Sequence, residues 1–314
     1  MWACGASDDA TTPVTSGADA GTSTGSSSGG SPAGDAGSSS SGSAGTDAGP
    51  PSADPCATSP AVPAERPSVA NTGVPAGTAL TPSGDIKADT KGMTISAKDV
   101  TGQILVSADD VTIVNSKVHT KGGENDIAIK VADGVKGTKV LHSEIYTESG
   151  GYVGFLGGDS FVCASYFHGW ENGMTLGGGM VVQACFIEKL ASGQAGAHYD
   201  GIEVYSGGAP SKLIGNHIRM TDPTDKWLDE TGAINLTAYQ GDIDDVEMTG
   251  NMLGGGSYTL YVDEQNGSKA TNVKLTNNTF YKGTPAYGPF LVRRAASVTT
   301  FSGNKFEDGT VIQP

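Results

Sequence analysis

The chain has 314 residues, of which 47 are glycine and only 17% are charged, and its formal net charge is −15. Residues 1–60 carry six acidic side chains and no Lys or Arg, so the rest of the chain has a net charge of −9, which argues against binding to nucleic-acid phosphates. No apolar run approaches the roughly 18 residues that cross a bilayer, and no heptad pattern is sustained, so we expect neither a membrane-spanning helix nor a coiled coil.

The first segment of the chain is a tract of Ser, Gly, Ala, Asp and Pro. Between Trp2 and Leu80 it contains no aromatic residue, no leucine and no isoleucine, so it cannot bury enough apolar surface to offset the entropy of ordering. We therefore expect a disordered linker over residues 5–60, followed by a single globular domain.

The chain starts Met1-Trp2-Ala3-Cys4-Gly5, which resembles the end of a bacterial lipoprotein signal. The resemblance implies that residues 1–4 are the remnant of such a signal. It also implies that Cys4 is lipidated and anchors the chain to the outer membrane or cell envelope, with the linker as a tether. The charged and apolar parts of the signal are missing, so an ordinary disordered extension is the alternative.

The four cysteines do not follow the pattern of a disulfide scaffold or a zinc site. Cys4 and Cys56 fall in the linker, and Cys163 and Cys185 have no CxxC spacing. We expect Cys163 and Cys185 to be free, mostly buried thiols.

From residue 93 onward one pattern recurs nine times: apolar, any, small, Asn or Ser, any, apolar. A second run of alternating apolar residues follows each of the first eight, and this period of two indicates half-buried strands. The first positions of the nine repeats are Ile95, Ile113, Val140, Val162, Val182, Leu213, Met248, Leu275 and Phe301. The fourth positions are Lys98, Ser116, Ser143, Ser165, Cys185, Asn216, Asn251, Asn278 and Asn304.

Repeats of this kind cannot bury a face alone and must stack. We predict an all-β fold: a single-stranded, right-handed parallel β-helix of about nine coils over residues 93–314, with residues 61–92 as an N-terminal cap. The small third position suits a tight corner, and the fourth-position side chains are expected to form a hydrogen-bonded ladder. A β-sandwich is the alternative, but it does not explain the ninefold recurrence. We expect a monomer.

The repeats resemble the pectin-lyase-like β-helix superfamily over residues ~70–314. The segments that resemble secreted bacterial β-helix proteins are Asn71–Thr81, His198–Glu203 and Gly254–Val262. The resemblance implies an extracellular or cell-surface location and a polysaccharide partner, without fixing an activity.

Ile202 and Val204 are expected to face the core, so Glu203 and Tyr205 face outward. The outward positions of successive coils are predicted to be Leu105, Ala128, Gly154, Thr175, Glu203, Asn235, Tyr261 and Leu291. Polar residues gather near the middle of this line. The candidate catalytic residues are His198, Asp200, Glu203, Asp229 and Glu230, and the candidate substrate-binding residues are His168, Glu171, Tyr205, Arg219, Lys226, Asn235 and Tyr261.

Two segments partly resemble polygalacturonase-type glycoside hydrolases. His198–Glu203 resembles the Asn-Thr-Asp-Gly-apolar-Asp signature of that family, and Asp229–Asn235 resembles its Asp-Asp-Cys-x-Ala-Ile-Asn segment. The resemblance implies a carboxylic acid and a carboxylate acting on either side of a water, as in inverting enzymes. The match ends at Gly255-Gly256-Ser257, where the family has Gly-His-Gly.

A polysaccharide lyase is the second hypothesis. It requires a base and a cation that neutralises a uronate carboxylate, and Arg219, His168 and Lys226 are available. Calcium is a possible source of that charge, held by an acidic loop made of Asp222, Asp225, Asp229 and Glu230. The third hypothesis is a non-catalytic surface lipoprotein that binds glycan or another cell. The sequence thus predicts a cell-surface protein that binds and cleaves a polysaccharide, with adhesion as the alternative.

Overall fold

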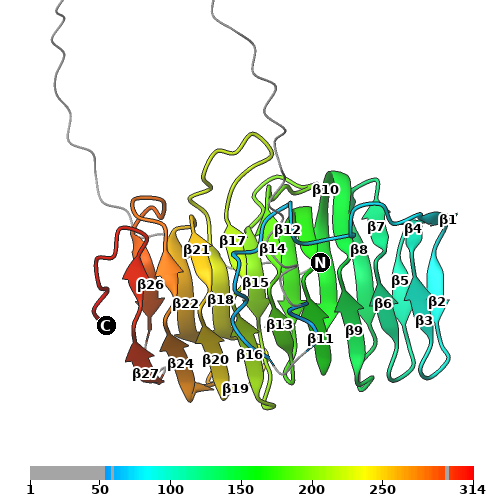
Figure 1. Cartoon of the computed structure of the whole chain (residues 1–314). Coiled ribbons are helices and arrows are strands. Elements are labelled where there is room, and N and C mark those ends of the chain that lie inside the picture. The colour runs from blue at the N-terminus through cyan, green and yellow to red at the C-terminus, as the bar shows by residue number, and fades with distance from the viewer. Residues whose placement is uncertain (1–53, 58–59, 294–296) are drawn as a thin grey trace, which may run out of the picture. The chain divides into compact units, whose positions relative to one another are not determined.

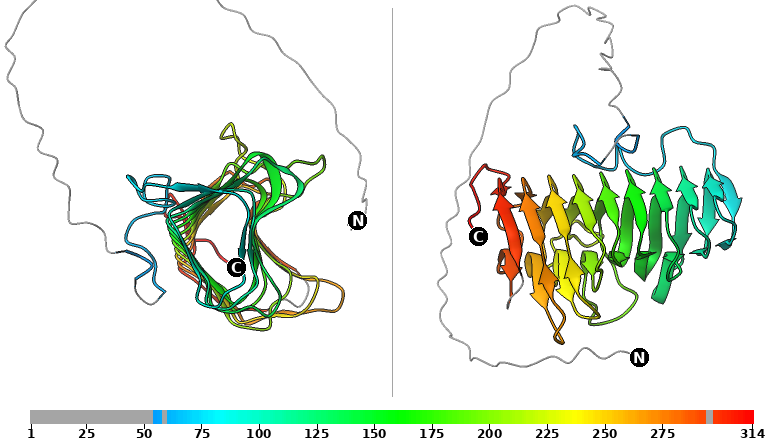
Figure 2. Two further views of the ribbon diagram at one scale, coloured as in Figure 1. Left: turned by 90° about the vertical axis from the view of Figure 1, so that its right-hand side faces the viewer. Right: turned by 90° about the horizontal axis from the view of Figure 1, so that it is seen from below.

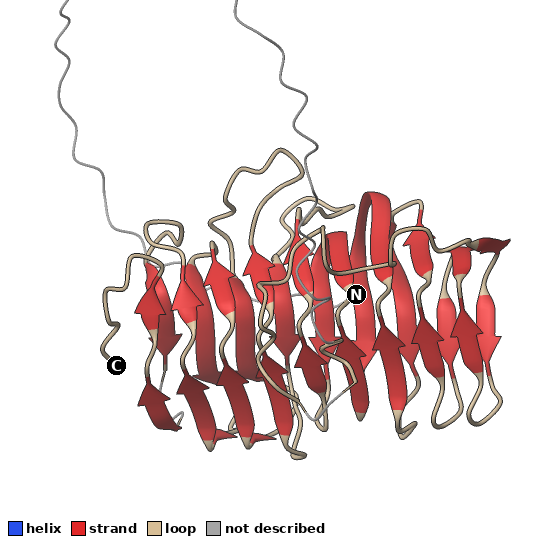
Figure 3. Ribbon diagram, viewed as in Figure 1, coloured by secondary structure: helices blue, strands red, loops and turns tan. Residues whose placement is uncertain are grey.

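The structure is a computed structural model in which residues 54–57, 60–293 and 297–314 are described. These residues belong to the unit Pro50–Pro314, whereas the unit Met1–Gly49 lies outside them. The described residues form strands and turns and contain no helix, hence none long and apolar enough to cross a membrane (Figure 3). All pairings between these strands are parallel, which confirms the all-β prediction and is consistent with a parallel β-helix (Figure 1).

The chain winds between a nine-stranded sheet and a 17-stranded sheet, and in a view along the stack the coils overlie one another (Figure 2). The 17-stranded sheet consists of two rows of strands joined by two long strands, and these rows are called the second and third sheets below. The first sheet has nine strands, one from each repeat: β3 (Thr94–Ser96), β6 (Thr112–Val114), β9 (Thr138–Leu141), β11 (Ser160–Cys163), β13 (Val181–Gln183), β16 (Ser211–Ile214), β20 (Val246–Thr249), β24 (Val273–Thr276) and β27 (Val298–Ser302).

The second sheet follows after a tight corner and contains β1 (Thr81–Ser83), β4 (Lys98–Thr101), β7 (Lys117–Thr120), β10 (Glu144–Gly157), β12 (Tyr166–Leu176), β14 (Phe186–Glu188), β17 (His217–Arg219), β21 (Met252–Gly254), β25 (Thr279–Phe280) and β28 (Lys305–Phe306). The long strands β10 and β12 continue into the third sheet. Its other strands are β2 (Ile86–Ala88), β5 (Ile104–Val106), β8 (Gly123–Val131), β15 (Asp200–Val204), β18 (Gly232–Ala238), β22 (Tyr258–Glu264) and β26 (Gly288–Val292). A short pair, β19 (Ile243–Asp244) and β23 (Ala270–Thr271), lies apart.

The interior column predicted from the repeats is confirmed. Each first-position residue pairs with that of the next repeat, from Ile95 with Ile113 through to Leu275 with Phe301. All nine except the last are buried, and Phe301 is half-buried at the C-terminal end of the stack. The burial of this column is the main favourable term for stacking the coils.

The predicted corner and ladder are also present. Every third-position residue of the repeats has a positive φ, from 45° at His142 to 68° at Gly303, which turns the chain sharply between the first and second sheets. From Ser116 onward, the fourth-position side chains accept hydrogen bonds from the backbone of the preceding coil, whereas Lys98 has no side-chain acceptor. Asn251 Oδ1, for example, accepts from Asn216 N at 2.9 Å, and Asn278 Oδ1 accepts from Asn251 N at 3.0 Å. The ladder therefore satisfies buried backbone donors at each corner.

The outward row of the third sheet differs from the prediction in two places. Leu105 pairs with Lys130, and Leu156 pairs with both Lys130 and Thr175, so Lys130 and Leu156 occupy the positions expected for Ala128 and Gly154. Ala128 and Gly154 are instead buried. The long strands β8 and β10 begin before the bend into the third sheet, and the simple alternation of sides does not hold across that bend.

The expectation that Cys163 is a free thiol is wrong. Cys56 and Cys163 form a disulfide with their Cα atoms 5.9 Å apart, and Cys185 is the free, buried thiol of the described residues. Nearby, Gln183 Nε2 donates to the Pro55 carbonyl at 2.7 Å, so this segment lies on the coils. The sequence argument assigned Cys56 to a linker without contacts to the fold, which removed it from consideration as a partner.

Residues 61–80, the first part of the cap predicted over residues 61–92, run along the corner between the first and second sheets (blue in Figure 2). The Pro67 carbonyl lies 2.8 Å from His217 Nδ1, and Gly73 N donates to the Ala164 carbonyl at 2.9 Å. Strands β1 and β2 follow and pair with β4 and β5, so they add to the N-terminal end of the second and third sheets.

Candidate functional site

The candidate site lies on the outward side of the third sheet and contains two acidic residues of strand β15, Asp200 and Glu203. Glu203 has Thr175 of β12 and Asn235 of β18 as its strand neighbours, as predicted. Asp200, three residues before Glu203 in the same strand, pairs with Asn172 of β12. Only 1% of Asp200 and 5% of Glu203 is exposed.

Gly201 makes this placement possible. A methyl group at Gly201 would overlap the Ile218 side chain and lie 2.5 Å from the Ala233 carbonyl oxygen, so this position faces the core. Ile202 is also fully buried in the core. With two successive residues turned inward, the side chains of Asp200 and Glu203 come to the same outer face.

Both carboxyl groups are held by hydrogen-bond donors. Asp200 Oδ1 accepts from Gly232 N at 3.3 Å, and Asp200 Oδ2 accepts from Asn235 Nδ2 at 3.3 Å. Glu203 Oε2 accepts from Asn172 Nδ2 at 3.1 Å and from the Thr175 hydroxyl at 3.3 Å. Asn172 bridges the two acids, because its Oδ1 also accepts from Asp200 N at 3.2 Å.

The electrostatic state of the pair is unusual for carboxylic acids. Burial raises the pKa of Glu203 from 4.5 to about 7, with the charge of Glu171 acting in the same direction. Burial, and after it the neighbouring charge of Glu203, raises the pKa of Asp200 well above its usual range. Among the described residues no Lys or Arg lies within ion-pair distance of either carboxyl group. The pair therefore retains a proton into the neutral range.

Glu171 forms the third acidic member of the site. Its Oε2 accepts from the Ser192 hydroxyl at 2.6 Å and from Gln194 Nε2 at 3.0 Å, which ties the loop before β15 to strand β12. The charge of Glu171 raises the pKa values of both Asp200 and Glu203, so it lies close to them.

Tyrosines surround the acids. The phenol of Tyr205 hydrogen-bonds to Glu203, Tyr152 is close enough for the charges of Glu203 and Glu171 to raise its pKa, and the charge of Asp200 contributes to the raised pKa of Tyr261. Seven of the ten tyrosines in the chain belong to this group through such contacts or through ring pairs: Tyr152, Tyr199, Tyr205, Tyr239, Tyr258, Tyr261 and Tyr287.

The other three catalytic candidates, His198, Asp229 and Glu230, lie on the flanking loops with exposed side chains. The Asp229 carbonyl accepts from the Ser257 hydroxyl at 2.6 Å, and the charge of Glu230 contributes to the raised pKa of Tyr199. Of the five residues, the structure brings together Asp200 and Glu203.

Two substrate-binding candidates, His168 and Arg219, are on the second sheet instead. His168 Nε2 lies 3.2 Å from Glu144 Oε1, and its ring stacks on Tyr146 with centroids 5.1 Å apart. Arg219 donates to Glu188 at 2.6 Å. His168 belongs to a ladder in which each ring packs against the next, and the ladder contains His119, Tyr146, His168, Tyr166, Phe186, His217 and Tyr281.

The acidic loop considered for calcium does not gather its carboxylates. Asp222 Oδ1 is occupied by Thr224 N at 2.8 Å and Lys226 N at 3.0 Å, and Asp225 lies 3.6 Å from Arg219. Lys226 itself is exposed.

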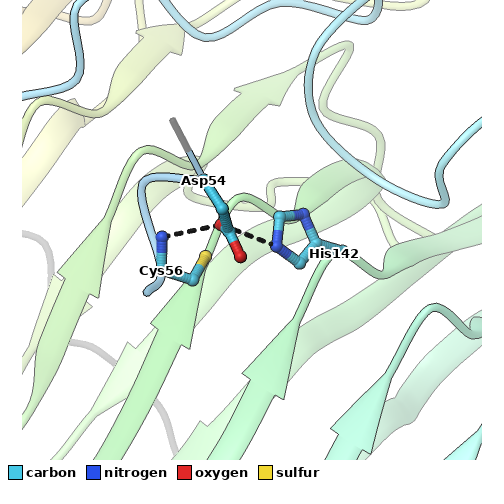
Figure 4. A group of neighbouring side chains, drawn as sticks. All are labelled: Asp54, Cys56 and His142. Atoms are coloured by element: carbon cyan, nitrogen blue, oxygen red, sulfur yellow. Dashed lines mark hydrogen bonds and ion pairs between the residues drawn. The ribbon is translucent and has the colours of Figure 1, made fainter. Parts of the chain in front are cut away.

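One group of metal-ligating residue types does meet among the described residues: Asp54, Cys56 and His142 (Figure 4). His142 Nε2 lies 3.0 Å from Asp54 Oδ1. The Cys56 sulfur is bonded to Cys163, so it provides no thiolate for a metal. Aspartate and histidine alone are left, and they interact with each other.

Asn172, which bonds to both acidic residues, and Tyr152, their neighbour, were not among the site residues predicted from the sequence. Asn172 was visible next to Glu171, but its role depends on the bend within β12. Comparison with protein-family models, with curated proteins and with solved structures gave no match to this chain.

Proposed function

We propose that this chain is a right-handed parallel β-helix of nine coils, similar to pectin-lyase-like proteins, that binds and hydrolyses an extracellular polysaccharide at the Asp200–Glu203 pair. The observation that carries the proposal is that two carboxyl groups of strand β15 are almost completely buried, that burial raises the pKa of both, and that they lie beside a group of tyrosines. Strongly perturbed acids in a polar cluster are typical of functional sites.

Hydrolysis of a glycosidic bond needs one carboxylic acid to protonate the leaving oxygen and one carboxylate to activate water. An ordinary glutamic acid is deprotonated at pH 7, whereas the pKa of Glu203 is about 7, and the charge of Glu203 contributes to the raised pKa of Asp200. Near neutral pH the pair thus offers a carboxylic acid and a carboxylate, and Asn172 bonds to the Glu203 carboxyl group and to the Asp200 backbone N–H.

Elimination is less well supported. A lyase has to neutralise a uronate carboxylate, and the acids of the site are not accompanied by a cation within ion-pair distance among the described residues. Among the described residues, the cation whose charge affects the pKa of Tyr261 is Arg293. Its guanidinium lies 3.9 Å from Asp263. A polyuronate would meet several carboxylates before it met this charge.

Binding without cleavage is the alternative, and one observation favours it. With 1% and 5% exposure, the carboxyl groups of Asp200 and Glu203 contact a substrate only if the side chains that cover them move. Tyr287, in contrast, is 76% exposed, so its ring is available to a sugar.

A location outside the cytoplasm is part of the proposal. The Cys56–Cys163 disulfide supports it, because structural disulfides persist in oxidising compartments. Lipidation of Cys4, which lies outside the described residues, would hold the protein at the cell envelope. Replacing Cys4 by Ser in the expressing cell should move the protein from the membrane fraction to the soluble fraction, and unchanged fractionation would remove this part of the proposal.

The function is tested with a panel of neutral and acidic polysaccharides and two readouts. New reducing ends report hydrolysis, and absorbance of an unsaturated uronate in the near ultraviolet reports elimination. The wild type is compared with Asp200→Asn, Glu203→Gln and, as a control, Glu247→Gln on strand β20 of the first sheet. We expect reducing ends without ultraviolet absorbance, lost in the first two variants and kept in the control. Binding without product would support the alternative, and neither binding nor product would refute both.

A further inference from the structure

Three tyrosines extend the candidate site toward the C-terminal end of the stack. The ring of Tyr261 covers Gly232, whose N–H donates to Asp200, and its Cδ2 lies 3.0 Å from the point where a Cβ of Gly232 would be. Tyr258 packs edge-on against Tyr261, with centroids 5.6 Å apart and an interplanar angle of 85°. Tyr287 follows at 5.6 Å from Tyr258. The three rings form a continuous aromatic surface that begins beside Asp200.

The outermost ring is open to solvent. Tyr287 is 76% exposed and is the tyrosine with an exposed side chain in this group. The rings of the second sheet differ in this respect. His119 and Tyr146 lie face to face at 4.9 Å and 8°, so each covers a face of the other. The tyrosine cluster therefore differs from the aromatic ladder of the second sheet, because it ends in the solvent-exposed ring of Tyr287.

The charge around the cluster selects among sugars. Glu171, Asp200 and Glu203 lie on one side of it, and Asp263 follows on strand β22 near Arg293. At pH 7 and above this surface carries net negative charge, which repels polyanions and leaves neutral sugar chains unaffected.

We propose that Tyr258, Tyr261 and Tyr287 are a binding subsite in which the sugar rings of a neutral polysaccharide pack on tyrosine. Glu203 and Tyr261 are two strands apart in the outward row, which is about 10 Å, or roughly two sugar units, from the acid pair to the subsite. The inference rests on the proposed function and adds to it a substrate class and a direction in which the chain extends. Tyrosine suits this task because its ring is apolar, rigid and amphipathic at the tip.

The subsite is tested by the dependence of binding on chain length. Neutral cello-oligosaccharides of two and six units, and oligogalacturonides of the same lengths, are titrated calorimetrically into Glu203→Gln protein, in which they are not cleaved. The substitutions Tyr287→Ala, Tyr287→Phe and, as an exposed apolar control, Val311→Ala are made in that background. We expect Tyr287→Ala to weaken binding of the neutral hexamer about tenfold, with a clearly smaller effect on the dimer. Tyr287→Phe should retain most of the affinity because it keeps the ring, and Val311→Ala should leave it unchanged.

The result separates the subsite from the function on which it rests. Equal affinity of Tyr287→Ala and its parent for the hexamer overturns the subsite, even where the polysaccharide panel shows cleavage. Tighter binding of oligogalacturonides than of neutral oligomers overturns the assignment to neutral sugars. If neither series of oligosaccharides binds, the subsite is overturned. The proposed function is overturned as well only if the polysaccharide panel also yields no product.

Discussion

The raised pKa of Glu203 makes the stability of the protein depend on pH in a defined direction. In the folded state the carboxyl group has a pKa of about 7, against 4.5 for the ordinary group. Between these values the folded protein binds more protons than the unfolded chain, so the free energy of unfolding falls as the pH rises from 4.5 to 7. The difference amounts to about 3 kcal/mol, which is reached above pH 7 and is absent below pH 4.5, where the group is protonated in both states.

Glu203→Gln should remove this term, because glutamine is neutral at every pH and still accepts hydrogen bonds from Asn172 and Thr175. Urea denaturation of the wild type and the variant at pH 5 and pH 8 measures it. The free energy of unfolding of the variant, relative to that of the wild type, should increase by about 2 to 3 kcal/mol from pH 5 to pH 8.

Glu144→Gln is the matched control with the opposite sign. Hydrogen bonds from His168 and Lys117 hold the pKa of Glu144 at about 2, so its contribution is present above pH 4.5 and is lost as the pH falls toward 2. That variant should be less stable than the wild type at both pH values, with no advantage at pH 8. Parallel curves for Glu203→Gln and wild type would refute the raised pKa, and with it the role of this residue in the acid–base pair.

Three further changes test the fold that positions the site. Cys56→Ser opens a bond between residues 107 apart and should lower the free energy of unfolding by about 4 to 5 kcal/mol, and a reductant should destabilise the wild type but not the variant. Asn251→Ala leaves the buried Asn216 N–H without its acceptor and should cost about 2 to 4 kcal/mol in urea unfolding; a cost under 0.5 kcal/mol would show that the ladder is dispensable. Gly201→Ala meets the Ala233 carbonyl at 2.5 Å and should lower the melting temperature and weaken glycan binding, whereas Gly208→Ala, with nothing within 4 Å, should do neither.

The stacking of the coils was predictable because it depends on short, local patterns. The residues of the interior column and the ladder recur with the same neighbours in every repeat. The third position between them has a positive φ in every repeat, even where it is occupied by His142. The pairing of Glu203 with Thr175 and Asn235 followed from the same alternation of sides along each strand.

The composition of the site was less predictable because two of its determinants are not local. Strand β12 runs through the bend between two sheets, so His168 lies in the stacked ladder while Glu171, three residues later, reaches the acids. The donors to Asp200 come from the following coil, since Gly232 N and Asn235 Nδ2 both bond to its carboxyl group. The disulfide was missed for a related reason, since the contacts of residues 54–57 with the coils have no signature in a linker-like composition.

The role of the acid pair is tested most directly by the pH dependence of polysaccharide hydrolysis. The initial rate at which the wild type releases reducing ends from its best substrate is measured between pH 4 and 9, alongside Glu203→Gln and Glu247→Gln. The wild-type rate should rise as the pH approaches about 7, because Glu203 then becomes a carboxylate while its charge keeps the pKa of Asp200 raised; Glu203→Gln should be slower by at least about a hundredfold, and Glu247→Gln should follow the wild type. A Glu203→Gln protein with the rate and the pH profile of the wild type would contradict the assignment of Glu203 to catalysis.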